Sequence, residues 1–232
     1  MSYYLTGDTH GDPQKILDFI VRYGLTENDM IIILGDAGWN YSLDIRDWYT
    51  KKYLNNTGIK LFCIHGNHEE RPENIRTYHE VSTVYGNVYV EDEFPNLLFA
   101  KDGELYRFGT RQAIVIGGAY SVDKHYRLKH GYRWFSSEQP SEETKQRVED
   151  TLEQLNWNVD IVLSHTCPGK YTPVEAFLPG LDQSTVDKST EEWLDRIEDR
   201  LAYKQWFCGH WHIDKTVDKL RFVMDDLIEL PQ

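Results

Sequence analysis

The stretch Ile31-Ile32-Ile33-Leu34-Gly35-Asp36 decides the fold, because a short apolar run rich in β-branched residues ends at a glycine and a carboxylate. Such a run predicts a strand. Four other apolar runs are each followed by a polar motif in the same way: Gly7-Asp8-Thr9-His10 after Tyr3-Tyr4-Leu5, Gly66-Asn67-His68-Glu69 after Leu61-Phe62-Cys63-Ile64, Ser164-His165 after Ile161-Val162-Leu163, and Gly209-His210-Trp211-His212 after Trp206-Phe207-Cys208. Because ligands of α/β folds bind where such loops follow the strands, we expect the five motifs to gather at one edge of a sheet.

The first third of the chain alternates predicted strands and helices. A strand at Tyr3–Leu5 is followed by Asp12-Pro13, a capping residue and a proline that favour the start of a helix. Strand Met30–Leu34, a helix within Leu43–Leu54 and strand Lys60–Ile64 come next. This β-α-β-α-β order predicts a parallel sheet with right-handed crossovers.

The middle of the chain has a different pattern. We expect five short β-rich runs to form a second, largely antiparallel sheet: Val81–Val84, Val88–Val90, Leu97–Ala100, Leu105–Phe108 and Ala113–Ile116. After them, a loop rich in glycine, tyrosine and basic residues is predicted from Gly117 to about Pro140.

Alternating helices and strands return in the last third, and the tail is expected to close with a hairpin around Asp218-Lys219. The predicted elements are helix Ser141–Leu155, strand Ile161–Ser164, helix Thr190–Leu201, strand Gln205–Cys208 and the hairpin strands Lys215–Val217 and Leu220–Met224. No internal repeat or linker divides the sequence, so we expect one domain over residues 1–232.

Composition and charge narrow the class of protein. Hydrophobic residues make up 40% and charged residues 27% of the 232 residues, as in ordinary globular proteins. No apolar run approaches the ~20 residues that span a bilayer, and the N-terminus shows no signal-peptide pattern, so we expect a cytoplasmic protein. The net charge of −13 argues against a general nucleic-acid binder, which needs a basic face.

The polar motifs hold residue types that bind metals. Asp8 and His10 stand two positions apart just past a strand, so both side chains can reach one divalent ion. Asp36 ends the next strand, and its two oxygens can bridge two ions. The other motifs add an amide oxygen and three imidazole rings: Asn67, His165, His210 and His212. This set suits manganese, iron, zinc or nickel, and two such ions ~3.5–4 Å apart can hold a hydroxide and clamp a phosphoryl group.

In order along the chain, the motifs read Asp-x-His, Gly-Asp, Gly-Asn-His-Glu, His and Gly-His-x-His. This ordered set, which extends from residue 7 to residue 212, resembles the calcineurin-like metallophosphoesterase superfamily. The resemblance implies a four-layer α/β/β/α sandwich, an α/β fold in which two mixed β-sheets are flanked by helices. That expectation agrees with the two sheets predicted from periodicity.

The resemblance also implies roles for the motif residues. One metal would be bound by Asp8, His10, Asp36 and His212, and the other by Asp36, Asn67, His165 and His210. His68 would be the catalytic residue that stabilises the phosphoryl transition state and donates a proton to the leaving oxygen. Two divalent transition metal ions are therefore expected, manganese first, with iron, zinc or nickel as alternatives.

The chain departs from the pattern of many relatives after Gly35-Asp36. There it reads Ala37-Gly38-Trp39-Asn40, without the second aspartate and the substrate-binding arginine that often follow. His65 also stands where protein serine/threonine phosphatases typically carry an arginine. Both differences argue against a protein phosphatase and leave phosphate binding to other residues.

Residues 117–140 contain the best candidates for that task. In this acidic chain the segment combines cations and aromatic rings, which suits a phosphorylated substrate with a ring, such as a nucleotide. Arg127 is the first choice because a guanidinium can grip two phosphate oxygens, and Lys124 is the second. Trp39, beside Asp36, is a third candidate for lining the pocket. The alternative is an ordinary surface loop with its aromatic rings packed beneath.

The sequence thus predicts a dinuclear metal-dependent phosphoester hydrolase in which a metal-bridging hydroxide attacks a small phosphorylated substrate or nucleotide. Monoesters and diesters remain equally open. Two other functions are alternatives: a nuclease acting on a nucleic-acid polymer, which the acidic charge disfavours, and a non-catalytic protein-interaction scaffold on the same fold.

Overall fold

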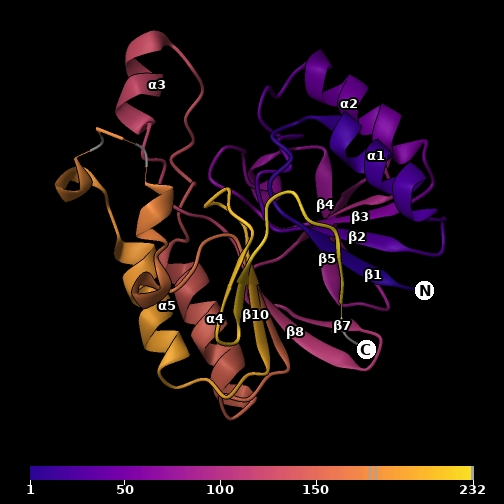
Figure 1. Ribbon diagram of the computed structural model, residues 1–232. Coiled ribbons are helices and arrows are strands. Elements are labelled where there is room, and N and C mark those ends of the chain that lie inside the picture. Colours follow the sequence, from indigo (N-terminus) through magenta and orange to yellow (C-terminus); the bar gives the residue numbers. More distant parts are fainter. Residues whose placement is uncertain (178, 181, 231–232) are drawn as a thin grey trace.

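Two β-sheets packed face to face form the centre of the molecule, and helices cover the outer side of each (Figure 1). The computed structural model of the chain describes residues 1–177, 179–180 and 182–230. The layers are therefore helices, sheet, sheet and helices, which confirms the predicted α/β fold with two mixed sheets. No helix in the described ranges is both long and apolar enough to cross a membrane.

The first sheet has seven strands in the order β13-β1-β2-β3-β6-β5-β4. Its strands β1, β2, β3 and β6 run parallel to one another. At its two edges β13 pairs antiparallel with β1, β5 pairs antiparallel with β6, and β4 pairs antiparallel with β5. The bounds are β1 Tyr3–Thr6, β2 Met30–Ile33, β3 Lys60–Cys63, β4 Tyr78–Ser82, β5 Asn87–Glu91, β6 Leu97–Ala100 and β13 Ile228–Glu229.

The second sheet has six strands in the order β11-β12-β10-β9-β8-β7, with a parallel centre and an antiparallel strand at each edge. The bounds are β7 Leu105–Phe108, β8 Arg111–Ile116, β9 Ile161–Ser164, β10 Gln205–Cys208, β11 Lys215–Val217 and β12 Leu220–Phe222. Strands β11 and β12 form the predicted closing hairpin.

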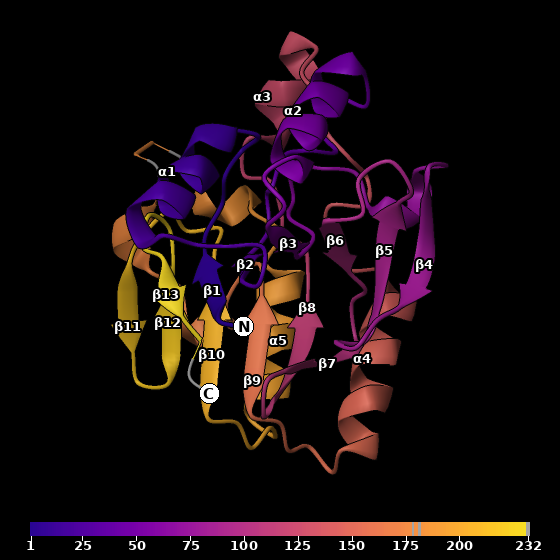
Figure 2. The same cartoon turned by 90° about the vertical axis from the view of Figure 1, so that its right-hand side faces the viewer.

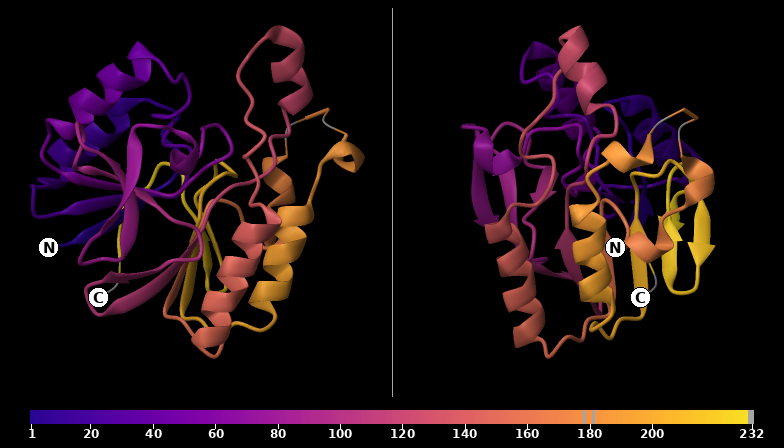
Figure 3. Two further views of the ribbon diagram at one scale, coloured as in Figure 1. Left: turned by 180° about the vertical axis from the view of Figure 1, so that it is seen from behind. Right: turned by 90° about the vertical axis from the view of Figure 1, so that its left-hand side faces the viewer.

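Helices α1 (Pro13–Tyr23) and α2 (Ile45–Asn55) cover the first sheet, while α4 (Glu142–Gln154) and α5 (Ser189–Glu198) cover the second (Figure 3). Helix α1 begins as predicted, with Asp12 accepting a hydrogen bond from the Gln14 amide and Pro13 at the first helical position. The remaining helical segments are α3 (Lys124–His130) and four short 3-10 turns, η1 Pro72–Asn74, η2 Gly169–Tyr171, η3 Val174–Ala176 and η4 Gln183–Thr185.

Three clusters of buried apolar side chains correspond to the three interfaces between the layers. The apolar run of strand β2 contributes to two of these clusters, because side chains alternate between the two faces of a strand. Ile32 joins the cluster between the two sheets, whereas Ile31 and Ile33 join the cluster beneath α1 and α2. An unbroken apolar run is thus what a central strand of this sandwich requires.

Two predictions about the sheets are wrong. The five β-rich runs in the middle of the chain do not make a sheet of their own, because β4, β5 and β6 extend the first sheet while β7 and β8 belong to the second. The five motifs do not gather at the edge of one sheet either. Their strands β1, β2 and β3 lie in the first sheet and β9 and β10 in the second, so the motif loops meet where two sheets end together (Figure 2).

Candidate metal centre

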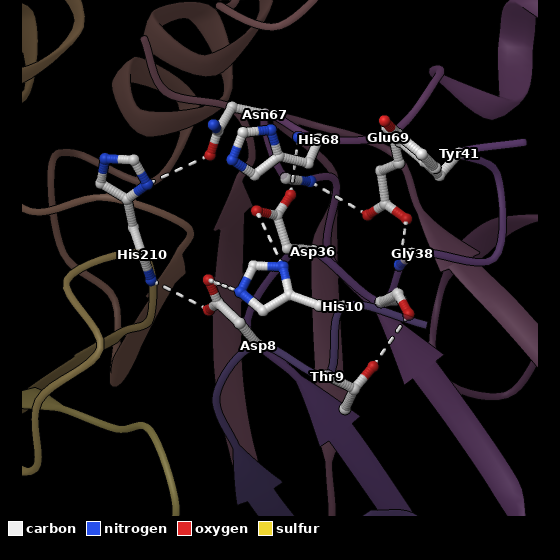
Figure 4. A network of polar contacts seen from close by, with 12 residues as sticks. Asp8, Thr9, His10, Asp36, Gly38, Tyr41, Asn67, His68, Glu69 and His210 are labelled. Atoms are coloured by element: carbon white, nitrogen blue, oxygen red, sulfur yellow. Dashed lines mark hydrogen bonds and ion pairs between the residues drawn. The ribbon is translucent and has the colours of Figure 1, made fainter. Parts of the chain in front are cut away.

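The loops after β1, β2, β3, β9 and β10 bring the predicted metal ligands and His68 into one region. Figure 4 shows Asp8, His10, Asp36, Asn67, His68 and His210 in this region. Asp8 and Asp36 are almost fully buried, as are Asn67 and His165, while His10 and His212 are more exposed. Residues that are far apart in the sequence touch here: Asp8 Oδ1 accepts a hydrogen bond from the backbone amide of His210.

Two glycines in the motifs allow this convergence. A Cβ atom on Gly35 would lie 1.9 Å from Nδ1 of His165, and one on Gly66 would lie 1.9 Å from Oδ1 of Asp36. Both distances are far below a van der Waals contact, so a side chain at either position would displace a predicted ligand. Gly35 also has φ +100°, which a residue with a side chain rarely adopts. The glycine preceding each carboxylate or amide is therefore part of the site.

Four predicted ligands have left-handed backbone conformations. His10, Asp36, His210 and His212 have φ values of 49°, 47°, 65° and 49°. Non-glycine residues seldom adopt such angles, and the cost of doing so is concentrated at functional sites, where it aims a side chain. Here each turn occurs within four residues of the end of a strand and directs the side chain toward the common centre.

Asp8, His10 and His212 form the first group of possible metal ligands. Nε2 of His10 lies 2.9 Å from Nε2 of His212, and Oδ2 of Asp8 lies 3.2 Å from the same His212 atom. Burial alone would raise the pKa of Asp8, but the hydrogen bond with His212 and the nearby histidines outweigh it and lower that pKa. The pKa of His212 is raised in turn, first by its hydrogen bond with Asp8.

Asn67, His165 and His210 form the second group. Oδ1 of Asn67 lies 2.8 Å from Nε2 of His165 and 3.1 Å from Nδ1 of His210. The amide of Asn67 is oriented by its nitrogen, which donates to the Ser121 hydroxyl at 2.9 Å, so its oxygen faces the histidines. Burial lowers the pKa of His210 well below its usual value, which favours the neutral ring that binds metals.

Asp36 lies between the two groups. One of its oxygens, Oδ2, is 3.9 Å from Nδ1 of His10 and 3.8 Å from Nε2 of His165, while Oδ1 accepts a hydrogen bond from the backbone amide of His68. Asp8, Asp36 and His165 also form a group whose ligand atoms lie within 4.8 Å of one another. Among the described residues, no other carboxylate has an oxygen within 4 Å of a histidine nitrogen from each group.

The chemistry of the donor atoms fits bound cations. Nδ1 of His165 donates to the Leu34 carbonyl at 2.8 Å, which leaves the lone pair of Nε2 directed at the oxygen of Asn67. The facing Nε2 atoms of His10 and His212 likewise need a proton or a cation between them. Lone pairs on nitrogen and oxygen atoms therefore face one another at short distances. A divalent transition metal bound between them would remove the repulsion.

His68 lies beside these groups without joining them. Its ring centroid is 6.0 Å from that of His10, and the residue lines the cavity in front of the ligands. Burial is the main cause that lowers the pKa of His68, and the positive charge of Arg127 adds to the effect. The side chain is thus placed to face a substrate.

Glu69 connects two of the motif loops. Its buried carboxyl group accepts hydrogen bonds from the Gly66 amide at 3.1 Å and from the Gly38 amide at 3.0 Å. Burial, together with the Asp36 charge, raises the pKa of Glu69 to about 8. Glu69 therefore fixes the loop that carries Asn67 and His68 against the loop that carries Asp36.

A cavity of about 1280 Å³ opens in front of the candidate ligands. Asp36, Asn67, His68, His210 and His212 line one end of it. From there it extends between α3 and the segment that contains η2, η3 and η4, as far as the first turn of α5. Its volume exceeds the ~300–1,000 Å³ of ordinary small-molecule sites, so the cavity can hold more than a phosphoryl group.

Arg127 is the one predicted substrate-binding residue that lines the cavity. It lies on α3, a seven-residue helix within the segment predicted as a loop, and its side chain is only 18% exposed. Nε of Arg127 donates to Asp123 at 2.7 Å, and Nη1 donates to the Tyr41 hydroxyl at 3.3 Å. These contacts hold the guanidinium at the cavity wall.

The structure does not bring Lys124 or Trp39 to the wall of the cavity. Lys124 is not among the residues that line the cavity; its ammonium group lies 4.0 Å from the centre of the Trp134 ring, in a cation–π contact. Trp39 is fully buried and packs against Phe99 in the core beneath α1 and α2. Proximity to Asp36 in the sequence is a misleading signal, because the chain turns inward after the carboxylate.

Sequence reasoning missed several residues that support or line the site. Ser121 orients Asn67, and Lys15 donates hydrogen bonds to the backbone carbonyls of Asp8 and Met224 at 2.8 and 2.6 Å. Tyr41 and Asp123 hold Arg127. The far wall of the cavity includes residues within 169–177 and 183–188, and these ranges carry no motif that predicts a role. No local pattern marks these residues, because most of them act through a partner distant in the sequence, as Ser121 does on Asn67.

Comparisons with known proteins agree with this geometry. The sequence profile of the calcineurin-like phosphoesterase family matches residues 1–214. No curated protein matches the chain. Among solved structures, the protein TT1561 of Thermus thermophilus is similar over 96% of this chain and 88% of its own, with 13% identity and a TM-score of 0.52, which shows a shared fold.

A sulfate thiohydrolase, SoxB, from the same organism also matches, with 16% identity and a TM-score of 0.39 over 93% of this chain and 36% of its own. The family profile covers nearly the whole chain, and the described residues carry the ligand types that the family uses. The chain therefore belongs to the calcineurin-like phosphoesterases, a family of metal-dependent hydrolases of phosphoester bonds.

Proposed function

We propose that the protein is a dinuclear phosphoester hydrolase that acts on a small phosphorylated substrate. The observation that carries the proposal is the position of Asp36, with Oδ2 within 4 Å of a histidine from each ligand group. One carboxylate between two clusters of nitrogen and oxygen donors is the arrangement that a pair of ions requires.

In this proposal, two ions are held by overlapping sets of side chains. Asp8, His10, Asp36 and His212 would hold one ion, and Asp36, Asn67, His165 and His210 would hold the other. When bound, the ions would supply an activated water as the nucleophile and neutralise charge on the phosphoryl oxygens. Manganese is our first choice of metal because the set mixes carboxylate, amide and imidazole donors without thiolates.

His68 has the catalytic role in the chain itself. It lines the cavity next to the ligands, and the bond from its backbone amide to Asp36 fixes its position relative to them. We propose that its ring stabilises the phosphoryl group in the transition state and donates a proton to the leaving oxygen. Burial and Arg127 lower its pKa, so a protonated ring at this position gives up its proton readily.

Arg127 is proposed to bind a phosphate oxygen opposite the metal ligands. It lines the same cavity as His68, and the electrostatic influence of Arg127 on the pKa of His68 reflects their proximity. Asp123 and Tyr41 restrain the guanidinium before a substrate arrives, which reduces the entropy lost on binding.

The two alternative functions have less support. A nucleic-acid polymer needs an extended basic surface, whereas the chain carries a net charge of −13 and the cavity walls include several carboxylates. A non-catalytic scaffold has no need for so many metal-binding and histidine side chains held together by glycines and left-handed backbone. The arrangement of the site therefore favours hydrolysis of a small phosphoester over both.

Metal analysis and a hydrolysis screen test the proposal together. Purified protein reconstituted with manganese should approach two ions per chain and should hydrolyse p-nitrophenyl phosphate, bis-p-nitrophenyl phosphate or a nucleotide from a panel. A stoichiometry that stays at one ion would overturn the dinuclear site. Two bound ions without hydrolysis of any ester in the panel would overturn the proposed activity.

A further inference from the structure

The cavity has two parts of different character. The first part holds the candidate metal ligands and His68. The second, which we call the distal part, is lined by η3, η4, the first two turns of α5 and the residues next to His212. Its walls include Val174, Phe177, Val186 and Ile213, together with Trp211, whose ring lies 6.1 Å from that of Phe177. This volume cannot be filled by a phosphoryl group, so it is available to the organic part of a substrate.

Charges on the distal part are predominantly negative. Asp187, Glu192 and Asp195 line it. The contacts of Asp187 and Asp195 are with neutral donors: Asp187 accepts from Gln139 and the Ser189 amide, and Asp195 accepts from the Lys170 amide. Glu192 is exposed, and no hydrogen bond or ion pair of its carboxylate is found among the described residues. These three carboxylates therefore keep their charge facing the cavity.

Most cations that line the cavity are paired with carboxylates. The ammonium group of Lys170 binds Glu198 and Asp199, which do not line the cavity. Arg127 is paired with Asp123 at 2.7 Å. Glu175 is neutralised by Lys215. Within the described part of the chain, this leaves Lys188 as the cavity-lining cation without a carboxylate partner, so the distal part has a negative balance.

We infer that the distal part of the cavity selects phosphoesters whose organic group is apolar and carries no negative charge, and that it favours a cationic group. The inference rests on the proposed function, because the phosphoryl group must lie at the ligand end for its organic substituent to reach this wall. An anionic substituent would meet like charges at short range, whereas an alkylammonium group would be attracted. Nucleoside polyphosphates are disfavoured for the same reason.

An alternative explanation exists for Glu192. A carboxylate in the first turn of a helix interacts favourably with the helix dipole, and Glu192 lies in the first turn of α5. That structural role would change stability but would not change the order in which substrates are preferred. Substrate selectivity and its dependence on salt therefore separate the two roles.

Three p-nitrophenyl phosphodiesters test the inference, because they share a leaving group and differ in the second substituent: choline, ethyl and carboxymethyl. We expect kcat/KM to fall in that order, with the choline ester at least tenfold above the carboxymethyl ester at about 20 mM salt and a much smaller ratio at about 500 mM. Equal values for the three esters would overturn the inference while leaving the phosphoesterase activity established. If none of them is hydrolysed although p-nitrophenyl phosphate is, the inference is overturned, because the distal part then accepts no such substituent. If p-nitrophenyl phosphate is not hydrolysed either, the result counts against the proposed function.

Variants of Glu192 locate the selectivity. Glu192→Lys should reduce the choline-to-carboxymethyl ratio at least threefold at low salt, and Glu192→Gln should reduce it by less. Glu143→Lys makes the same charge change on an exposed residue of α4 outside the cavity and should leave the ratio within experimental error. If Glu143→Lys altered the ratio as much as Glu192→Lys, net charge rather than the distal part would determine selectivity, and the inference would be wrong.

Discussion

The two ends of the cavity are built in different ways. At the ligand end, side chains emerge directly from the ends of five strands and are held by hydrogen bonds that cross between the sheets, such as Asp8 to His210. At the distal end, the wall consists of short 3-10 turns and the first turn of α5, with exposed residues such as Val174 and Glu192. The two sheets hold the residues of the ligand end in place, whereas the distal end consists of short turns and a helix start outside the sheets.

This difference separates chemistry from selectivity. Groups that bind metals must be held within a fraction of an ångström, which strands and buried backbone can achieve. Groups that recognise the organic part of a substrate need only a surface of suitable shape and charge, and loops change such surfaces without disturbing the core. Substitutions at the ligand end should therefore abolish catalysis, and those at the distal end should redistribute it among substrates.

Asp36→Asn should have the largest effect. Among the carboxylates of the described residues, Asp36 alone lies within 4 Å of a histidine from each group, so removing its charge should weaken both metal sites and lower kcat/KM about 10⁴-fold, or about 5.5 kcal/mol. Elemental analysis after reconstitution should find fewer than one ion per chain. Asp8→Asn is the matched control, because Asp8 should chiefly hold one ion and its variant should keep the other. Two ions retained in Asp36→Asn would contradict the bridging role.

His68→Ala should have the next largest effect and should differ in kind. Because His68 is not proposed to be a ligand, the variant should keep its metals while kcat falls by about 10²–10⁴-fold. The loss should be greater for alkyl phosphates than for p-nitrophenyl esters, whose leaving group needs no proton. Equal losses on the two kinds of ester would indicate that His68 acts only through charge on the phosphoryl group.

Much of the fold was predictable from the sequence because the strands are buried on both faces. Strands at Leu97–Ala100, Ile161–Ser164 and Gln205–Cys208 have the predicted bounds, and the parallel order of β1, β2 and β3 follows from the alternation with helices. The partition of the middle strands was not predictable. Whether β6 pairs with β3 or with β7 depends on tertiary contacts, and periodicity gives only the direction in which side chains point.

The candidate ligands were predictable for a different reason. Each is adjacent to the end of a strand, so local sequence places it, and metal chemistry restricts the residue types. The contacts that orient these ligands were not predictable, since the partner of Asn67 is Ser121 and that of His165 is the Leu34 carbonyl. Trp39 was misplaced because no local pattern distinguishes a ring that lines a pocket from one that fills the core.

Arg127→Ala should have a moderate effect, because it removes one proposed contact with the phosphate and leaves the metal ligands in place. We expect the variant to retain metals and fold while kcat/KM falls at least tenfold, or about 1.4 kcal/mol. A rise in KM alone would mean that Arg127 binds the ground and transition states alike, and a lower kcat would mean that it favours the transition state. Lys124→Ala is the matched control on the same helix and should change kcat/KM less than twofold, since Lys124 lies over Trp134 outside the cavity. Equal losses in the two variants would show a general dependence on the charge of α3.

Trp39→Phe should have the smallest effect on catalysis. It tests whether a change in the core beneath the ligand end alters substrate binding. The Trp39 ring is fully buried against Phe99, and its indole N–H has no hydrogen-bond partner among the described residues. Replacing it with phenylalanine removes an unsatisfied donor but leaves a small cavity, so the loss of stability should be below the ~3–5 kcal/mol typical of truncation to alanine. KM should stay within a factor of about two of the wild-type value, because a residue that does not touch substrate contributes no binding energy. A lower melting temperature with unchanged KM would support this expectation. A tenfold rise in KM at unchanged stability would contradict it and would indicate that Trp39 contacts the substrate.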